Sequence, residues 1–232
     1  TLFANHYPSA DSRLPADEIT LSCTAPSGSQ VSAWISDTVV ALTDDGSGHY
    51  SAPLPQGTSP PEQEHILYTA EKHGFVRVAF SRGALSLLDE DEMIAFSVTS
   101  DNSDLCLTTD PQDGSDGFLL KGMTGLADGL NNGFLHLPNQ GYLRLSDVDI
   151  VTPADIKSYN LTGITCTEDK ELYTISFDCG GLPAVTCRFD EGKLCLTAQP
   201  IDLAFLFESP LFSDISLEQI QQTAIYTMTL RS

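Results

Sequence analysis

Short stretches in which apolar and polar residues alternate run through most of the chain, and this period of two is typical of strands with one buried face. In the first part of the chain they occur at 19–23, 31–35, 39–42, 50–54, 65–70 and 75–80. Turn-forming residues separate them roughly every 8–12 residues, which predicts an Ig-like β-sandwich over 16–92. Residues 1–15 have prolines but no period and are predicted to be a tether.

The middle of the chain is rich in glycine and other turn formers between short apolar runs. These runs lie at 94–99, 105–107, 118–120, 126–130, 133–137 and 142–145. Several short strands with wide turns over about sixty residues predict a small SH3-like barrel over 93–152. The acidic run Asp89-Glu90-Asp91-Glu92 and the linker Thr152-Pro153-Ala154 are its expected boundaries.

The last part, 153–232, is predicted to be a small antiparallel, sandwich-like β module. Its strands are expected at 161–167, 172–179, 184–189, 193–198 and 224–230. Residues 205–213 are read as an apolar loop or short helix. A helical turn is expected at 216–219, with Ser216 as its cap and Gln219 at its third position. The fold class is therefore all-β, built from tandem small β modules.

The charge of the chain excludes several classes of partner. There are 11 Lys plus Arg against 32 Asp plus Glu, for a formal net charge of -21. A surface this acidic repels phosphodiesters and anionic lipids, so we expect neither nucleic-acid binding nor membrane insertion by this segment. No run approaches the ~20 apolar residues of a transmembrane helix. A start without Met fits an exported protein whose export segment has been removed.

Six cysteines lie at 23, 106, 166, 179, 187 and 195, and none forms a CxxC or CxC pair. This spacing gives no support for a zinc knuckle. Several of them fall mid-strand with apolar parity, as Cys23 does with Ile19 and Leu21. We therefore expect buried free thiols, and we expect no cofactor.

Three sets of residues contain side chains that could ligate a metal or act in catalysis. Asp45-Gly46-Ser47-Gly48-His49, with Glu62, Glu64 and His136, contains zinc-ligand types, but the string is better interpreted as a hairpin turn. The loop 110–117 is acidic yet lacks the Asp-x-Asp-x-Asp-Gly spacing of a calcium loop. Cys106 and His136 are both expected in strands, without a nucleophile signature around either. We therefore assign no catalytic residue and no metal ligand.

Aromatic side chains beside hydrogen-bonding groups are the features that a sugar or muropeptide site requires. Phe134, Tyr142 and Arg144 lie in the middle segment near Asn131, Asn132 and Asn139. Trp34, the only tryptophan, interrupts the apolar parity of its two neighbours, so its ring is expected to face outward. Phe134, Tyr142, Arg144 and Trp34 are the predicted binding residues.

Three segments carry a resemblance to a known family. They are VSAWISDTVVALTDDGSGHYSAPLP, FLLKGMTGLADGLNNGFLHLPNQGYLRLSDVDI and the run 161–189. In this order they resemble the Ig-like, bacterial SH3-like and small β modules of the non-catalytic N-terminal region of secreted Firmicutes N-acetylmuramoyl-L-alanine amidases. Family members hydrolyse the lactyl-amide of peptidoglycan with a zinc held by His and Glu. The resemblance implies a catalytic domain after Ser232.

The resemblance implies a non-catalytic, extracellular or cell-wall-associated region that targets or positions a peptidoglycan hydrolase. Its expected partner is peptidoglycan or a cell-surface protein. One alternative is an extracellular protein-interaction or adhesion segment without a hydrolase. The other is an unrecognised enzyme built on a β scaffold.

Overall fold

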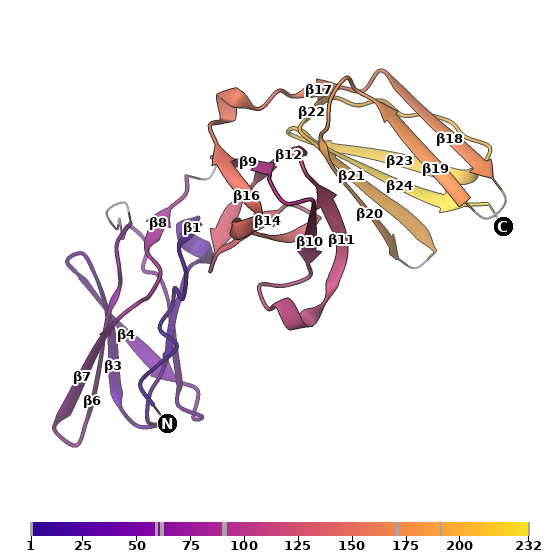
Figure 1. Ribbon diagram of the computed structural model, residues 1–232. Helices are drawn as coiled ribbons and strands as arrows, with labels where there is room; N and C mark the ends of the chain where they lie inside the picture. Colours follow the sequence, from indigo (N-terminus) through magenta and orange to yellow (C-terminus); the bar gives the residue numbers. More distant parts are fainter. Residues whose placement is uncertain are drawn as a thin grey trace. The chain divides into compact units, whose positions relative to one another are not determined.

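The computed structural model describes residues 2–58, 60, 63–89, 92–169, 172–190 and 192–231, and it confirms the all-β class (Figure 1). Within these ranges the helical elements are single 3-10 turns: η1 (Ala16–Glu18), η2 (Pro111–Asp113), η3 (Leu145–Asp147) and η4 (Pro153–Asp155). No helix in the same ranges is long and apolar enough to cross a membrane.

The chain separates into two compact units. Unit 1 comprises Thr1–Met93 and Asp128–His136, and unit 2 comprises Ile94–Ala127 and Leu137–Ser232. The first unit thus contains residues Asp128–His136, which come from the segment expected to form the SH3-like barrel. The division into modules over 16–92, 93–152 and 153–232 stays a prediction, and Glu62, Glu90 and Asp91 lie outside the described residues.

A six-stranded antiparallel sheet dominates unit 1. Its strand order is β2 (Thr20–Thr24), β5 (His49–Pro53), β4 (Thr38–Asp44), β3 (Gln30–Ile35), β6 (Leu67–Lys72) and β7 (Phe75–Phe80). Alternate residues of these strands enter one core, among them Leu21, Cys23, Ala33, Ile35 and Tyr68. The period-two pattern therefore predicted both the strands and their buried face.

Unit 1 also holds the parallel pair β1 (Ser12–Leu14) and β8 (Leu85–Leu87), with β13 (Gly129–Asn131) antiparallel to β1 and β14 (Phe134–Leu137) antiparallel to β13. β1 lies within the segment predicted to be a tether. Residue Ala4 bridges to Thr24, and the backbone of Ala10 runs so close to Gly83 that a Cβ there would overlap it. Described residues of 1–15 are therefore part of the packed unit.

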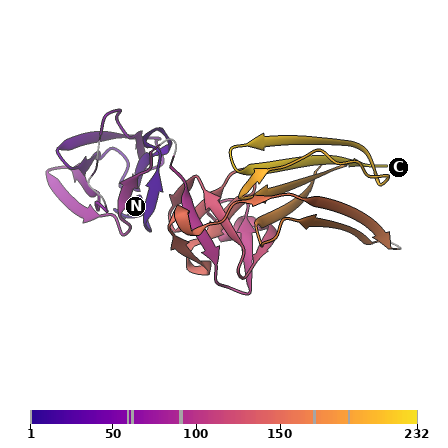
Figure 2. The same ribbon diagram turned by 90° about the horizontal axis from the view of Figure 1, so that it is seen from above.

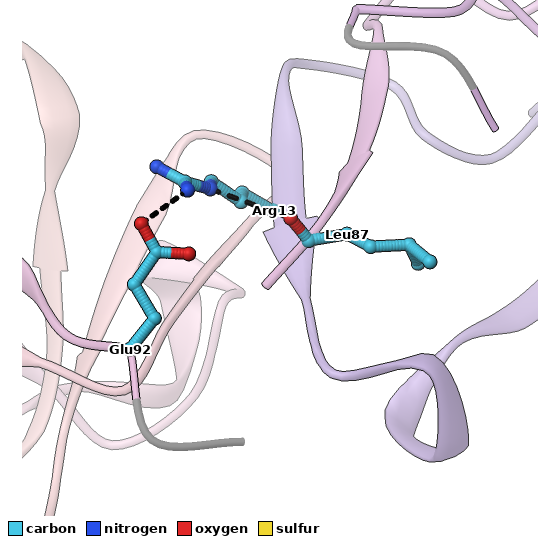
Figure 3. Close-up of polar contacts among 3 residues, drawn as sticks. All are labelled: Arg13, Leu87 and Glu92. Carbon is cyan, nitrogen blue, oxygen red and sulfur yellow. Dashed lines mark hydrogen bonds and ion pairs between the residues drawn. The ribbon is translucent and has the colours of Figure 1, made fainter. Parts of the chain in front are cut away.

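An arginine on β1 fixes the strand to its neighbours (Figure 3). The guanidinium of Arg13 lies 2.5 Å from Oε1 of Glu92, and its Nε donates to the carbonyl of Leu87 at 3.4 Å. Both charged side chains are about 41% exposed, so the ion pair orients the strand more than it stabilises it.

Unit 2 contains several small sheets. One sheet has the order β12 (Thr124–Ala127), β9 (Ile94–Val98) and β16 (Val148–Val151). Another set of strands pairs in the order β11 (Ser115–Leu120), β10 (Asn102–Cys106) and β15 (Gly141–Arg144). The remainder is a hairpin of β18 (Gly163–Asp169) and β19 (Leu172–Asp178), a parallel pair of β17 (Tyr159–Asn160) and β22 (Ile201–Leu203), and a four-stranded sheet.

The four-stranded sheet has the order β20 (Ala184–Asp190), β21 (Lys193–Gln199), β24 (Thr223–Leu230) and β23 (Phe212–Ile220), and its strands appear from above in Figure 2. Leu196, Tyr226 and Met228 are buried on it, and Phe177 from β19 packs against them. The helical turn predicted at 216–219 is wrong, because these residues lie in β23 and pair with β24. Ile215 and Leu217 alternate toward the core, and this packing overrides the local capping signal.

Candidate binding surface

A row of apolar side chains crosses four strands of the six-stranded sheet. Trp34 on β3 is paired with Val39 on β4 and with Leu67 on β6, and Leu67 is paired with Phe80 on β7. Residues directly opposite each other in an antiparallel sheet project from the same face. Val39, Trp34, Leu67 and Phe80 therefore form one continuous row, called here the Trp34 row.

The Trp34 row faces away from the core. Trp34 is 43% exposed, Val39 49% and Phe80 63%, whereas Ala33 and Ile35 are buried on the opposite face. The outward orientation predicted for Trp34 is therefore confirmed. An exposed apolar strip of this kind is typical of a contact surface.

Hydroxyl groups border the Trp34 row. The adjacent row across the same strands contains Ser32 and Thr69, which are paired with each other. Nε1 of Trp34 donates to Oγ1 of Thr69 at 3.4 Å, so the indole is oriented within the sheet face. An aromatic face beside hydroxyls can stack on a ring while hydrogen bonds set its orientation.

The strand β7 extends this apolar surface to the end of the sheet. Val76 and Val78 lie on the same face as Phe80 and are 60% and 59% exposed, and Phe75 at the hairpin tip is 79% exposed. The sequence signal for this exposed apolar strand is FVRVAF itself, which is apolar at every position except Arg77 and so lacks the usual alternation. Val39, Val78 and Phe80 are exposed residues of this apolar surface that the sequence analysis did not single out.

The sequence from Lys72 to Arg82, which contains β7, is basic although the chain is acidic. Lys72, Arg77 and Arg82 account for three of the chain's 11 basic residues, and no acidic residue lies between Lys72 and Arg82. This run of the sequence therefore differs from the rest of a chain with a net charge of -21, although Glu71 on β6 lies opposite Val76.

The other predicted binding residues lie on strands outside the six-stranded sheet that contains Trp34. Phe134 is half-buried in β14 of unit 1, whereas Tyr142 and Arg144 lie in β15 of unit 2. Asn132 accepts a hydrogen bond from the backbone of Ser9 through its side-chain oxygen at 2.8 Å. The binding role of Phe134, Tyr142 and Arg144 stays a prediction.

The string that resembles a zinc site is a hairpin connection held by a carboxylate. Oδ1 of Asp44 accepts from the backbone of Gly46 at 2.9 Å and of Gly48 at 3.0 Å. Oδ2 accepts from the hydroxyl of Ser27 at 2.7 Å, and this bond, followed by those from backbone amides, lowers the pKa of Asp44. His49 is exposed at the start of β5.

The other zinc-ligand types have separate neighbours. Glu64 accepts from the backbone and hydroxyl of Ser36 at 2.6 and 3.0 Å. Nδ1 of His136 lies 2.6 Å from Oδ1 of Asp128, and this hydrogen bond raises the pKa of His136. In the ranges that the structure describes, no three His, Cys, Asp or Glu side chains are grouped to hold a metal.

The acidic loop 110–117 bonds to itself. Asp110 caps η2 by accepting from the backbone of Gln112 at 2.9 Å, and Asp113 accepts from the hydroxyl of Thr108 at 2.7 Å. Nearby Cys106 is buried in β10 of unit 2, and His136 belongs to unit 1. These carboxylates act as turn and cap groups in the loop.

All six cysteines are free thiols, as predicted, but only Cys23 and Cys106 are buried. Burial raises the pKa of Cys23 to about 11, so this thiol stays protonated. Cys187 is exposed on the edge strand β20, which corrects the expectation that the thiols are uniformly buried. Partial loss of hydration, and then the neighbouring Cys195, nevertheless raise the pKa of the Cys187 thiol.

Comparisons with protein-family models, with curated proteins and with solved structures give no match to this chain.

Proposed function

We propose that this chain is a non-catalytic, extracytoplasmic region that targets or positions a peptidoglycan hydrolase, an N-acetylmuramoyl-L-alanine amidase, at the cell wall. The observation that carries the proposal is the exposed Trp34 row on the outward face of the six-stranded sheet. The same strands β3, β4 and β5 contain the first of the three segments that resemble the amidase region.

The chemistry of the Trp34 row suits a sugar polymer. Sugar rings have an apolar face that stacks on an aromatic ring, and their hydroxyls bond to groups such as those of Ser32 and Thr69. Because the row crosses four neighbouring strands, successive rings can lie along it. Because cell walls and this chain are both anionic, attraction must come from these short-range contacts rather than from net charge.

Sedimentation of the purified chain with isolated sacculi tests the proposal. We expect the chain to pellet with sacculi, and Trp34→Ala to weaken binding by roughly 1 kcal/mol or more. Trp34→Phe should retain much of the binding because it keeps a ring. Binding should hold or strengthen as salt rises, because salt screens the repulsion between two anionic surfaces.

Phe118→Ala is the matched control, because Phe118 is 57% exposed but lies on β11 of unit 2. It should bind sacculi like the wild type. Phe134→Ala and Tyr142→Ala test, in the same assay, the residues proposed from the sequence. No association of the wild-type chain at any salt concentration would refute wall targeting.

The free edge of β7 favours a second function, protein interaction. An edge strand with exposed apolar side chains and unpaired backbone groups is a template for pairing with another strand. Loss of wall binding together with retained protein association would support this alternative.

A further inference from the structure

The strands β7 and β23 each lie at one end of a sheet. β7 is the last strand of the six-stranded sheet in unit 1, and β23 is the last strand of the four-stranded sheet in unit 2. Each is joined to its only neighbour in that sheet by a two-residue turn, at 73–74 and at 221–222. Each strand therefore has one side on which its backbone is not paired within its sheet.

The turns determine which backbone groups point outward. A two-residue turn requires its closing pair to be hydrogen-bonded, and these pairs are Lys72 with Phe75 and Ile220 with Thr223. Bonded and non-bonded pairs then alternate along each ladder. The N–H and C=O groups that point outward belong to Val76, Val78 and Phe80 on β7, and to Ile215, Leu217 and Gln219 on β23.

These two sets of backbone groups can face each other in several antiparallel registers, and in one of these the side chains also match. Val78 opposite Leu217 places Phe80 opposite Ile215 and Val76 opposite Gln219, so that outward backbone groups face outward backbone groups. The intervening residues then bring Arg77 opposite Glu218, and the exposed Phe75 opposite the exposed Ile220. Opposite charges and apolar pairs directly across a ladder both stabilise strand pairing.

Neighbouring registers lose this match. A shift by two residues, which preserves the backbone alternation, places Arg77 opposite Ser216 or Ile220 instead of Glu218. Pairing of β7 with another β7 would bring together two basic edges and supply no carboxylate. Within the described residues the side chains of Arg77 and Glu218 have no ion-pair partner.

We propose that β7 of one copy pairs antiparallel with β23 of a second copy, through the register in which Arg77 faces Glu218. The partner is thus another molecule of this chain, and the contact is head-to-tail, because the two copies contribute different strands. The local complementarity is opposed by the net charge of -21 on each copy, so association should increase as salt screens that repulsion.

Charge reversal tests the proposal by sedimentation velocity over a concentration series at physiological salt. The wild-type chain should associate reversibly, and Arg77→Glu or Glu218→Arg should each weaken association by about tenfold. An equimolar mixture of the two variants should recover association, because each contact between unlike copies then has one acid and one base. Such recovery is specific to a head-to-tail contact.

Lys157→Glu is the matched control, since it changes the net charge as Arg77→Glu does, but Lys157 is exposed and belongs to neither strand. It should associate like the wild type. Circular dichroism and thermal unfolding confirm that each variant is folded. The proposal is overturned by a wild type that stays monomeric throughout the series, by single variants that associate normally, or by a mixture that does not recover.

Discussion

At the scale of single residues, Asp44 joins two separate turns through one carboxylate. Its carboxylate receives hydrogen bonds from Ser27, Gly28, Gly46, Gly48 and Tyr50, and these come from two separate turns and a strand. Gly46 and Gly48 both have positive φ, which other residues rarely adopt. The carboxylate therefore holds together a connection whose backbone alone would be weakly ordered.

Asp44→Ala should lower the melting temperature at neutral pH, because the amides and hydroxyls around it lose their acceptor. Hydrogen bonding lowers the pKa of Asp44 in the folded chain. A lowered folded pKa contributes stability above the unfolded value of about 3.9, and this contribution is lost as the pH falls through the folded pKa. The difference in melting temperature between the wild-type chain and Asp44→Ala should therefore become smaller in strong acid.

Thermal unfolding of both chains from pH 7 down to about pH 2 measures this gap. Asp37→Ala serves as control, because Asp37 is an exposed turn residue and should change little at any pH. A gap of constant size across this range would contradict a role for the Asp44 charge.

At the scale of elements, β7 is an end strand of the six-stranded sheet, as β2 is at the other end, and within that sheet it pairs with β6 alone. The amides of Arg77 and Ala79 point toward β6, whereas those of Val76, Val78 and Phe80 point away from it. Amide hydrogen exchange should therefore alternate along β7, with slow exchange at residues 77 and 79 and fast exchange at 76, 78 and 80.

NMR-detected exchange on the dilute chain gives this pattern residue by residue. Raising the protein concentration should slow exchange at 76, 78 and 80 while leaving 77 and 79 unchanged, since the added strand covers the outward groups. The amides of β3, which is paired on both sides, provide the internal reference. Uniform exchange along β7 would show that its outer edge is already covered.

Local pattern predicted most strands because one face of each is buried, as Leu21 and Cys23 show on β2. The local pattern failed at 216–219, where pairing of Leu217 with Tyr226 determines the conformation. A four-residue capping signal contains no information about that distant partner. The outward orientation of Trp34 could be predicted because this residue interrupts the apolar alternation of Ala33 and Ile35. Phe80 was missed, because the Trp34 row exists only through the registers of three strand pairs and the position of β7 at the sheet end.

At the scale of the whole molecule, the dominant physical feature is the excess of 32 acidic over 11 basic side chains. Carboxylates of like charge repel one another within a Debye length, which is about 10 Å at 0.1 M salt and about 30 Å at 0.01 M. At low salt each acidic side chain therefore acts on many others. Folding brings these charges closer together than they are in the unfolded chain, so repulsion weighs more heavily on the folded state.

Raising NaCl from a few millimolar to physiological strength should increase the melting temperature. If salt removes roughly 1 kcal/mol of repulsion from the folded state, the melting temperature should rise by about 2–4 °C for a chain of this size. Differential scanning calorimetry at low protein concentration measures the shift without contributions from association, which salt should also promote. The same increase with KCl identifies screening as the cause, since screening depends on ionic strength rather than on ion type. A flat or falling melting temperature would show that the acidic side chains are too dispersed over the surface to interact.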